Sequence, residues 1–259
     1  MALTTTTSEP LSHDRHSSTG WWMLALGVAQ IVTSQSPEWF GIGRSVVERS
    51  AETSHPLVPL GPAFAIWGVI YVYALVSAVW AIRHPDNRVL KTAGGPMAII
   101  WAMNALWSLW VPLNGIDGVS VILIAISVIT GLYALVRLKH MATDRSEQGF
   151  VIAPLALVTG WVSAAMVVNL TSALVQMNAM PDPRIMMVSL CFLLVLIAFG
   201  GVMTRLTHSL VYATPLIWAL GWIAAANMLR QNEPLMAFTA LMGMGLILVL
   251  MLTIKRRAA

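Results

Sequence analysis

One stretch of the chain, residues 62–82, carries no charged side chain over twenty-one positions and has the sequence PAFAIWGVIYVYALVSAVWAI. A helix rises about 1.5 Å per residue, so about twenty apolar residues cross the roughly 30 Å hydrocarbon core of a bilayer. The stretch is therefore predicted to span a membrane. Within it, Phe64, Trp67 and Tyr71 stand at i, i+3 and i+7, which places three aromatic rings on one helix face.

The rest of the chain has the same character. Hydrophobic residues make up 58% of the sequence and charged residues only 10%, and soluble domains carry roughly a quarter charged residues. The sequence thus predicts an all-α integral membrane protein with a single membrane domain and lipid around it. The net charge of +4 does not indicate nucleic-acid binding, because the basic residues are scattered over helix ends instead of clustered on one face.

Eight apolar segments separated by polar turns are predicted to be helices. They cover residues 21–33, 62–82, 96–113, 118–138, 150–176, 185–203, 210–228 and 234–254. Residues 1–19 are polar and are expected to form a mobile tail. Residues 34–61 mix both charge signs with Gly and Pro, which argues against a crossing and favours an external segment that could act as a lid.

The Lys and Arg residues predict the orientation of these helices. If all eight helices cross, 11 of the 15 basic residues fall on the side that holds both termini, and 4 fall on the side of residues 34–61. Membrane proteins concentrate Lys and Arg in their cytoplasmic loops. We therefore expect both termini in the cytoplasm and the membrane to be the inner membrane of a bacterium.

Aromatic and amide side chains inside the predicted helices are the candidate ligand-binding groups. Trp67, Trp107 and Trp161 lie too deep for an interfacial belt, and an aromatic face beside amide donors suits a flat, mainly apolar ligand. The alternative is that the tryptophans fill wide gaps between helices. Asn104 and Asn169 lie in apolar surroundings where each amide must find a partner, which is either a ligand or a neighbouring helix.

Catalytic and metal-binding patterns are missing from the predicted helix interiors. The six histidines lie in the tail, in the 34–61 segment or at helix ends, and no Lys or carboxylate stands in the middle of a helix. Haem ligation by imidazole and proton-coupled transport therefore have no candidate residues. We expect a protein that is not an enzyme and requires no cofactor or metal, although chemistry on a bound porphyrin would not need an ionisable group.

Three motifs resemble the tryptophan-rich sensory protein family, TspO, also called the translocator protein or peripheral benzodiazepine receptor. The first places prolines ahead of F-x-x-W-x-x-x-Y, the second is N-x-x-W-S in the third helix, and the third is W-V-S-x-A-x-x-x-N in the fifth helix. The matching residues here are Pro59, Pro62, Phe64, Trp67 and Tyr71; then Asn104, Trp107 and Ser108; and then Trp161, Val162, Ser163, Ala165 and Asn169.

The resemblance implies a TspO-like five-helix bundle over residues 20–178, followed by three additional transmembrane helices over 179–259. It also implies a pocket, capped by the segment after the first helix, that binds a hydrophobic small molecule such as a porphyrin, another tetrapyrrole or a sterol-like lipid. The expected ligand-binding residues are Phe64, Trp67, Tyr71, Asn104, Trp107, Trp161, Ala165 and Asn169. Sensing, regulation or transport would follow from binding.

A different class of function stays open at this point. Helix 185–203 contains Gly200 and Gly201, and helix 234–254 contains Gly243 and Gly245. Small residues let helix backbones approach closely in membranes. The additional helices could thus pack internally, form a homodimer, or join a partner in a larger membrane complex. In the last case the protein would be a structural or accessory subunit.

Overall fold

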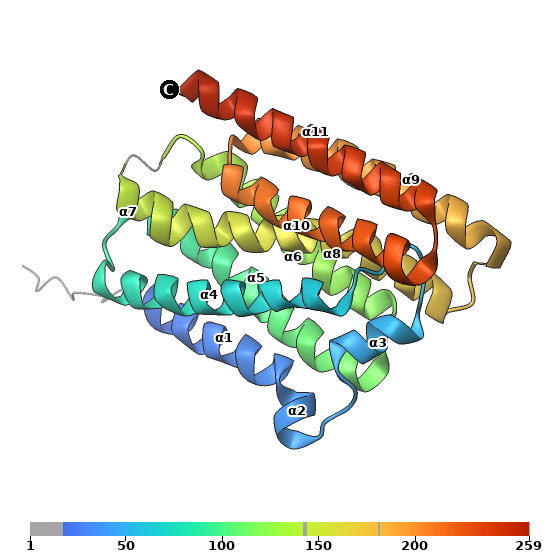
Figure 1. Cartoon of the computed structure of the whole chain (residues 1–259). Coiled ribbons are helices and arrows are strands. Elements are labelled where there is room, and N and C mark those ends of the chain that lie inside the picture. The colour runs from blue at the N-terminus through green and yellow to red at the C-terminus, as the bar shows by residue number, and fades with distance from the viewer. Residues whose placement is uncertain (1–17, 142–143, 181, 259) are drawn as a thin grey trace, which may run out of the picture.

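The structure, a computed structural model, describes residues 18–141, 144–180 and 182–258. The expected mobile tail, residues 1–19, lies almost entirely outside these residues. Within the described residues the chain forms helices and no strand, with eight long helices running along one another (Figure 1). These are α1 (Thr19–Ser34), α4 (Ile66–Arg83), α5 (Arg88–Asn114), α6 (Gly118–Leu138), α8 (Ala153–Gln176), α9 (Asp182–Thr207), α10 (Leu210–Ala226) and α11 (Pro234–Ala258).

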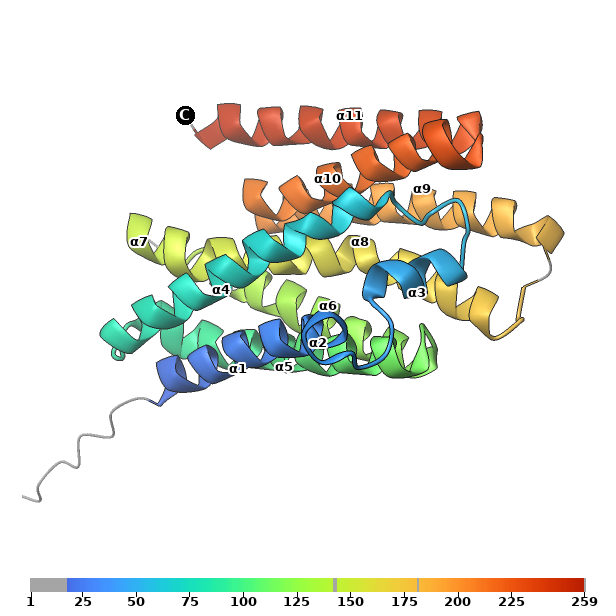
Figure 2. The ribbon, with the colours of Figure 1, turned by 60° about the horizontal axis from the view of Figure 1, so that its bottom comes forward.

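Seven of the eight long helices in the described part are long and apolar enough to cross a membrane. Helix α1 is the exception, because its 16 residues cover only about 24 Å at 1.5 Å per residue. It packs against α4 and α5, with its axis roughly aligned with those of the other long helices. The first residues of α1 and the last residues of α11 lie at the same end of the bundle (Figures 1 and 2).

One predicted boundary was wrong by eight residues. The third long helix begins at Arg88 instead of 96, because the side chain of Asn87 caps it by accepting a hydrogen bond from the Leu90 backbone N–H at 2.9 Å. A proline inside a helix removes one hydrogen bond without ending the helix when tertiary packing holds it, and Pro96 lies within α5.

Residues 34–61 were expected to be an ordered or partly ordered segment that does not cross, and the structure folds them into short helical elements. They contain α2 (Ser36–Phe40) and α3 (Val46–Glu52) and lead into the 3₁₀ helix η1 (Gly61–Ala65). Helix α3 begins with a capping box in which Ser45 and Glu48 satisfy each other's backbone N–H groups. The shorter elements elsewhere are α7 (Arg145–Glu147) and the π-helical turns η2 (Gln148–Ile152) and η3 (Asn227–Gln231).

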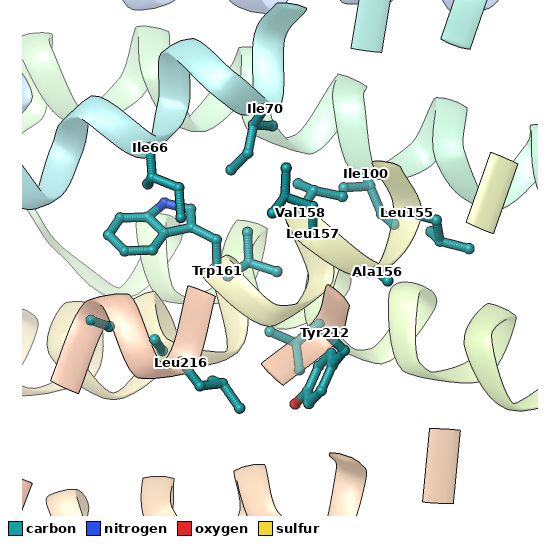
Figure 3. Close-up of a cluster of buried hydrophobic side chains, with 14 of the residues drawn as sticks. Ile66, Ile70, Ile100, Leu155, Ala156, Leu157, Val158, Trp161, Tyr212 and Leu216 are labelled. Atoms are coloured by element: carbon teal, nitrogen blue, oxygen red, sulfur yellow. The ribbon is translucent and has the colours of Figure 1, made fainter. Parts of the chain in front are cut away.

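Helix α8 is the centre of the bundle. Two thirds of its spanning segment (67%) is buried, against 28% for α9 and for α11, which lie together on the side of the bundle opposite α1 (Figure 1). Helix α10 packs closely against α8 because residue 160 of α8 is a glycine. A Cβ on Gly160 would lie 2.2 Å from the Tyr212 carbonyl oxygen, which is too close for any side chain. Figure 3 shows the resulting core, with Trp161 extending from α8 on the side of α4 and Tyr212 reaching α8 from α10 on the other side.

The glycines of the C-terminal helices serve packing inside the molecule. A Cβ on Gly243 of α11 would lie 2.4 Å from Ile197 of α9, and one on Gly200 would lie 2.8 Å from Leu216 of α10. Gly245 has no heavy atom within 4 Å of such a Cβ. Close helix approach within one chain therefore explains Gly200 and Gly243 without a second copy.

Candidate functional site

A cavity lies between α4, α5, α6, α8 and α10, below the end of the bundle that carries α3. Its described lining consists of apolar, aromatic, amide and hydroxyl side chains. They are Val46, Ser50, Pro59, Phe64, Trp67, Asn104, Trp107, Ile116, Ile124, Trp161, Val162, Ala164, Ala165, Val168, Asn169, Ala219 and Ile223. Seven of the eight residues expected from sequence are among them; Tyr71 is not.

Three aromatic rings form one side of the cavity. The ring of Trp161 meets those of Phe64 and Trp67 edge to face, with centroids 6.5 Å and 6.2 Å away. Tyr71 stacks on Trp67 at 5.5 Å and is itself buried. Because Trp67 lies on the cavity wall and Tyr71 does not, Tyr71 supports the Trp67 ring from outside the cavity. Edge-to-face contacts stabilise ring orientation by about 0.5–1.5 kcal/mol per pair.

The two asparagines that line the cavity play different parts. Asn169 of α8 accepts a hydrogen bond from Trp107 Nε1 at 3.1 Å and donates through Nδ2 to Ser120 Oγ at 2.9 Å. Its amide thus links α8 to α5 and α6, as interhelical hydrogen bonds do in membrane proteins. Of the two roles expected for a buried amide, bonding to a ligand or to a neighbouring helix, Asn169 has the second.

Asn104 differs because its amide nitrogen, Nδ2, has no hydrogen-bond partner among the described residues, although the residue is only 4% exposed. The same holds for Nε1 of Trp161, also 4% exposed. Both residues line the cavity. An unpaired buried N–H costs about 1–3 kcal/mol, so the cavity holds two donors that a ligand or water with an acceptor atom would satisfy.

The segment 41–60, here called the cover, closes the cavity at one end. Its first arm, residues 41–52, contains α3 and contributes Val46 and Ser50 to the lining. Arg49 holds this arm to the end of α5, where its guanidinium donates from Nη2 to the carbonyl oxygens of Pro112 at 2.9 Å and Leu113 at 3.3 Å. Carbonyls at a helix C-terminus lack intrahelical partners, which makes them natural acceptors for arginine.

The second arm, residues 53–60, is held by the C-terminal part of the chain. Asn227 Nδ2 donates to the Pro56 carbonyl oxygen at 2.7 Å, Arg230 Nη2 to that of Val58 at 3.1 Å and Gln231 Nε2 to that of His55 at 2.9 Å. Just beyond the arm, Trp218 Nε1 donates to the Ala63 carbonyl oxygen at 2.8 Å. Helix α10 and turn η3 therefore position the cover over the cavity.

His55 is the buried ionisable residue of the second arm. Its Nδ1 accepts from the Leu57 backbone N–H at 3.2 Å, so Nε2 carries the proton and donates to Ser172 Oγ at 2.9 Å. Burial, with a smaller contribution from the positive charge of Arg230, lowers the pKa of His55 to about 3. The imidazole is consequently neutral around pH 7 and acts as a structural hydrogen-bonding group.

Comparison with known proteins fits this arrangement. A family model described as TSPO-like protein matches residues 15–253. The chain belongs to the TSPO-like protein family. No curated protein and no solved structure matches the chain. The match to the TSPO-like family continues through α9 and α10 and over most of α11, so the three C-terminal helices lie within the matched region.

Sequence reasoning missed the contribution of α10 to the site of this TSPO-like protein. Ala219 and Ile223 line the cavity, and the rings of Trp218 and Trp222 meet edge to face 5.5 Å apart at the entrance to α4. The spacing of Trp218 and Trp222 at i and i+4 was the available signal. It showed that the two rings share a face, but not which helix that face would meet.

The volume of the cavity limits the size of a ligand that fits while the cover is in place. About 650 Å³ is free of protein atoms, but the centre of a water molecule can occupy only about 50 Å³ of it. That is room for a few waters and not for a macrocycle. No described lining residue has an ionisable side chain. The site is therefore suited to uncharged groups, and a large ligand requires the cover or a ring to move.

Proposed function

We propose that this TSPO-like protein binds a hydrophobic planar ligand, a tetrapyrrole or a sterol-like lipid, in the cavity beneath the cover. The observation that carries the proposal is the pair of unpartnered donors, Asn104 Nδ2 and Trp161 Nε1, on an otherwise apolar and aromatic wall. The rings of Phe64, Trp67 and Trp161 supply stacking area, and an acceptor atom of the ligand receives the two N–H groups. Binding serves sensing, regulation or transport of that ligand.

Binding is favoured over catalysis by the chemistry of the lining. General acid or base catalysis needs a titratable group within hydrogen-bond reach of the reacting atoms, and the polar groups of the described lining residues are two amides, one hydroxyl and three indole N–H groups. The expected energetics are modest. Two or three buried ring contacts at about 1.5–3 kcal/mol each offset the ordering costs of binding and give about micromolar affinity.

A titration of the purified protein with protoporphyrin, followed by the absorbance shift of the porphyrin, tests the proposal. A parallel titration uses a fluorescent sterol. Trp161→Phe keeps an aromatic ring and removes the N–H, and Asn104→Leu keeps the volume and removes the amide. Each is expected to weaken binding about threefold to tenfold, as one lost hydrogen bond does.

The matched controls are Trp39→Phe and Asn114→Ala, because both residues are exposed and absent from the described lining. They are expected to bind as the parent does. Absence of saturable binding of both ligands by the parent would contradict the proposal and favour the accessory-subunit alternative, in which the cavity stays closed. Equal binding by the parent and both site variants would show that the ligand lies elsewhere.

The orientation proposed for the membrane follows from charge. Among the described residues, the basic residues near the covered end are Arg44, Arg49, Arg184 and Arg230, and the other ten belong to the helix ends and turns toward the last turn of α11. We infer that the covered end faces away from the cytoplasm and that both termini are cytoplasmic, in a bacterial inner membrane. A reporter fused to the C-terminus should be active only in its cytoplasmic form.

A further inference from the structure

A second hollow lies on the outer surface of the bundle, far from the cover, where α4 meets η2. Its described lining is Leu75, Val76, Val79, Trp80, Arg83, His84 and Phe150. The centre of a water molecule can occupy about 330 Å³ of it, several times the corresponding space in the cavity. This groove follows α4 from Leu75 to Arg83, which is about 12 Å at 1.5 Å per residue.

A stack of three rings forms the fixed wall of the groove. Trp80 lies nearly parallel to His84 at 4.3 Å and to Phe150 at 5.9 Å. The His84 ring is also held by a hydrogen bond between Nδ1 and the Trp80 carbonyl oxygen at 2.9 Å. The Phe150 carbonyl oxygen, which belongs to the π-helical turn η2, accepts from Ser77 Oγ at 2.6 Å. π-Helical turns commonly mark functional sites.

The two ends of the groove differ in polarity. Val76 and Val79 are 42% and 40% exposed in the last third of an apolar spanning segment, which ends at Arg83. Arg83 thus stands where hydrocarbon gives way to lipid headgroups. Among the described residues, Arg83 belongs to none of the ion pairs, which join Arg44 and Arg49 to Glu52 and Lys91 to Asp86.

The acidic residues of the neighbouring turn are already engaged. Asp144 accepts from the backbone N–H and the hydroxyl of Ser146 at 2.7 Å and 2.8 Å. Glu147 Oε1 accepts from Asn87 Nδ2 at 2.9 Å. Arg83 is therefore available to an external anion, and the groove below it is available to an apolar chain.

We propose that this groove binds one anionic phospholipid, with its phosphate at Arg83 and an acyl chain along Leu75, Val76 and Val79. The combination of a cation at headgroup level and an exposed aliphatic surface beneath it matches an amphiphile with a negative head. Trp80 and Phe150 form the rigid side against which the chain lies. The proposal is independent of the ligand in the cavity, because the two described linings share no residue.

Lipid retention by the full-length protein, measured by native mass spectrometry in detergent, tests the groove. The parent is offered equimolar phosphatidylglycerol and phosphatidylcholine with identical acyl chains. Arg83→Gln removes the cation, and Val79→Trp fills the groove without changing charge. Arg137→Gln is the matched control, since Arg137 is an exposed arginine at the same end of the bundle, on α6 and outside the groove.

We expect the parent to retain phosphatidylglycerol about fivefold over phosphatidylcholine, the preference that one interfacial cation confers. Arg83→Gln should lose this preference, Arg137→Gln should keep it, and Val79→Trp should reduce retention of both lipids. Equal retention of the two lipids by the parent, or equal losses in both arginine variants, would overturn the proposal. Displacement of the lipid by millimolar inorganic phosphate would also overturn it, because the site would then recognise a soluble anion.

Discussion

The two arms of the cover are joined in sequence but are held in different ways. In the first arm, Arg44 and Val47 are largely exposed, and the side-chain links to the rest of the arm are ion pairs with Glu52 near the surface. In the second arm, His55, Leu57 and Val58 are at most 3% exposed. The second arm is thus part of the packed core, whereas the first arm lies on it.

The difference suggests how a ligand could enter. Lifting the first arm breaks the hydrogen bonds from Arg49 to the end of α5, whereas lifting the second arm would expose its buried residues and break the buried bond between His55 and Ser172, at about 1–3 kcal/mol. The first arm carries α3, whose Val46 and Ser50 line the cavity. Lifting α3 would therefore open the cavity at low cost while the second arm keeps its place against α10. The predictions below test this division, from the largest expected effect to the smallest.

Asn227→Ala should have the largest effect, because it releases the second arm. Asn227 is fully buried, and its Nδ2 donates hydrogen bonds to the carbonyl oxygens of Pro56 and Ile223. Leaving the Pro56 oxygen unpaired is expected to destabilise the protein by about 3 kcal/mol, seen as a lower melting temperature in detergent. Asn114→Ala, at an exposed position, should change stability by less than about 0.5 kcal/mol. Equal melting temperatures would show that the second arm is not structural.

Acid should release the same arm through His55. The pKa of the folded state is about 3 because burial excludes the charged form, and an unfolded histidine has a pKa of about 6.5. The unfolded state therefore binds the proton first, so stability is full above pH 6.5 and declines as the pH falls toward 3. The expected loss is about 2 kcal/mol at pH 5.

The comparison for the acid effect is His55→Asn, whose side-chain oxygen can still accept from the Leu57 N–H. This variant should start less stable, because it loses the bond to Ser172. Between pH 7 and pH 5 its melting temperature should fall less than that of the parent. If the two fall in parallel, protonation at another group controls the acid response.

The features of the fold and site that could be predicted from the sequence are those set by residues close together along the chain. Apolar runs near twenty residues long identified the seven spanning helices, because hydrophobic length is a local property. The stripe Trp161, Ala165 and Asn169 was likewise a matter of helical spacing, and all three residues line the cavity. Helix α3 was missed although the S-x-x-E pattern of its capping box, Ser45 to Glu48, was visible.

The support of the cover was beyond the reach of the sequence. The bond from Asn227 to Pro56 joins residues 171 positions apart, and the one from Trp218 to Ala63 joins residues 155 positions apart. No spacing rule connects such positions. The same limit applies to the two asparagines: both looked like buried amides, and only the neighbouring Trp107 and Ser120 distinguish the paired Asn169 from Asn104.

Gly43→Ala should detach the first arm with a smaller cost. Gly43 has φ +73°, and a Cβ there would lie 2.4 Å from the Pro112 carbonyl oxygen. The left-handed conformation alone costs about 1–2 kcal/mol for a residue with a side chain. Gly41→Ala is the matched control, since Gly41 has φ +65° and no heavy atom within 4 Å of such a Cβ. Proteolysis within residues 41–52 should therefore accelerate more for Gly43→Ala than for Gly41→Ala.

Arg49→Ala should change stability least and still distinguish the arms. Its guanidinium is the side-chain link between α3 and the carbonyl oxygens of Pro112 and Leu113, but it lies near the surface, so the loss should stay below about 1 kcal/mol. Porphyrin association measured by stopped flow should become about threefold faster, because lifting α3 requires breaking these bonds, whose net contribution is of that size.

Arg44→Ala gives the comparison for this rate, because the Arg44 side chain pairs with Glu52 within the same arm. Removing that pair leaves the bonds from Arg49 to α5 in place, so the association rate should stay that of the parent. A rate increase shared by both variants would mean that order within the first arm, and not its attachment to α5, controls entry. An unchanged rate for Arg49→Ala, together with a faster rate for Asn227→Ala, would move the point of entry to the second arm.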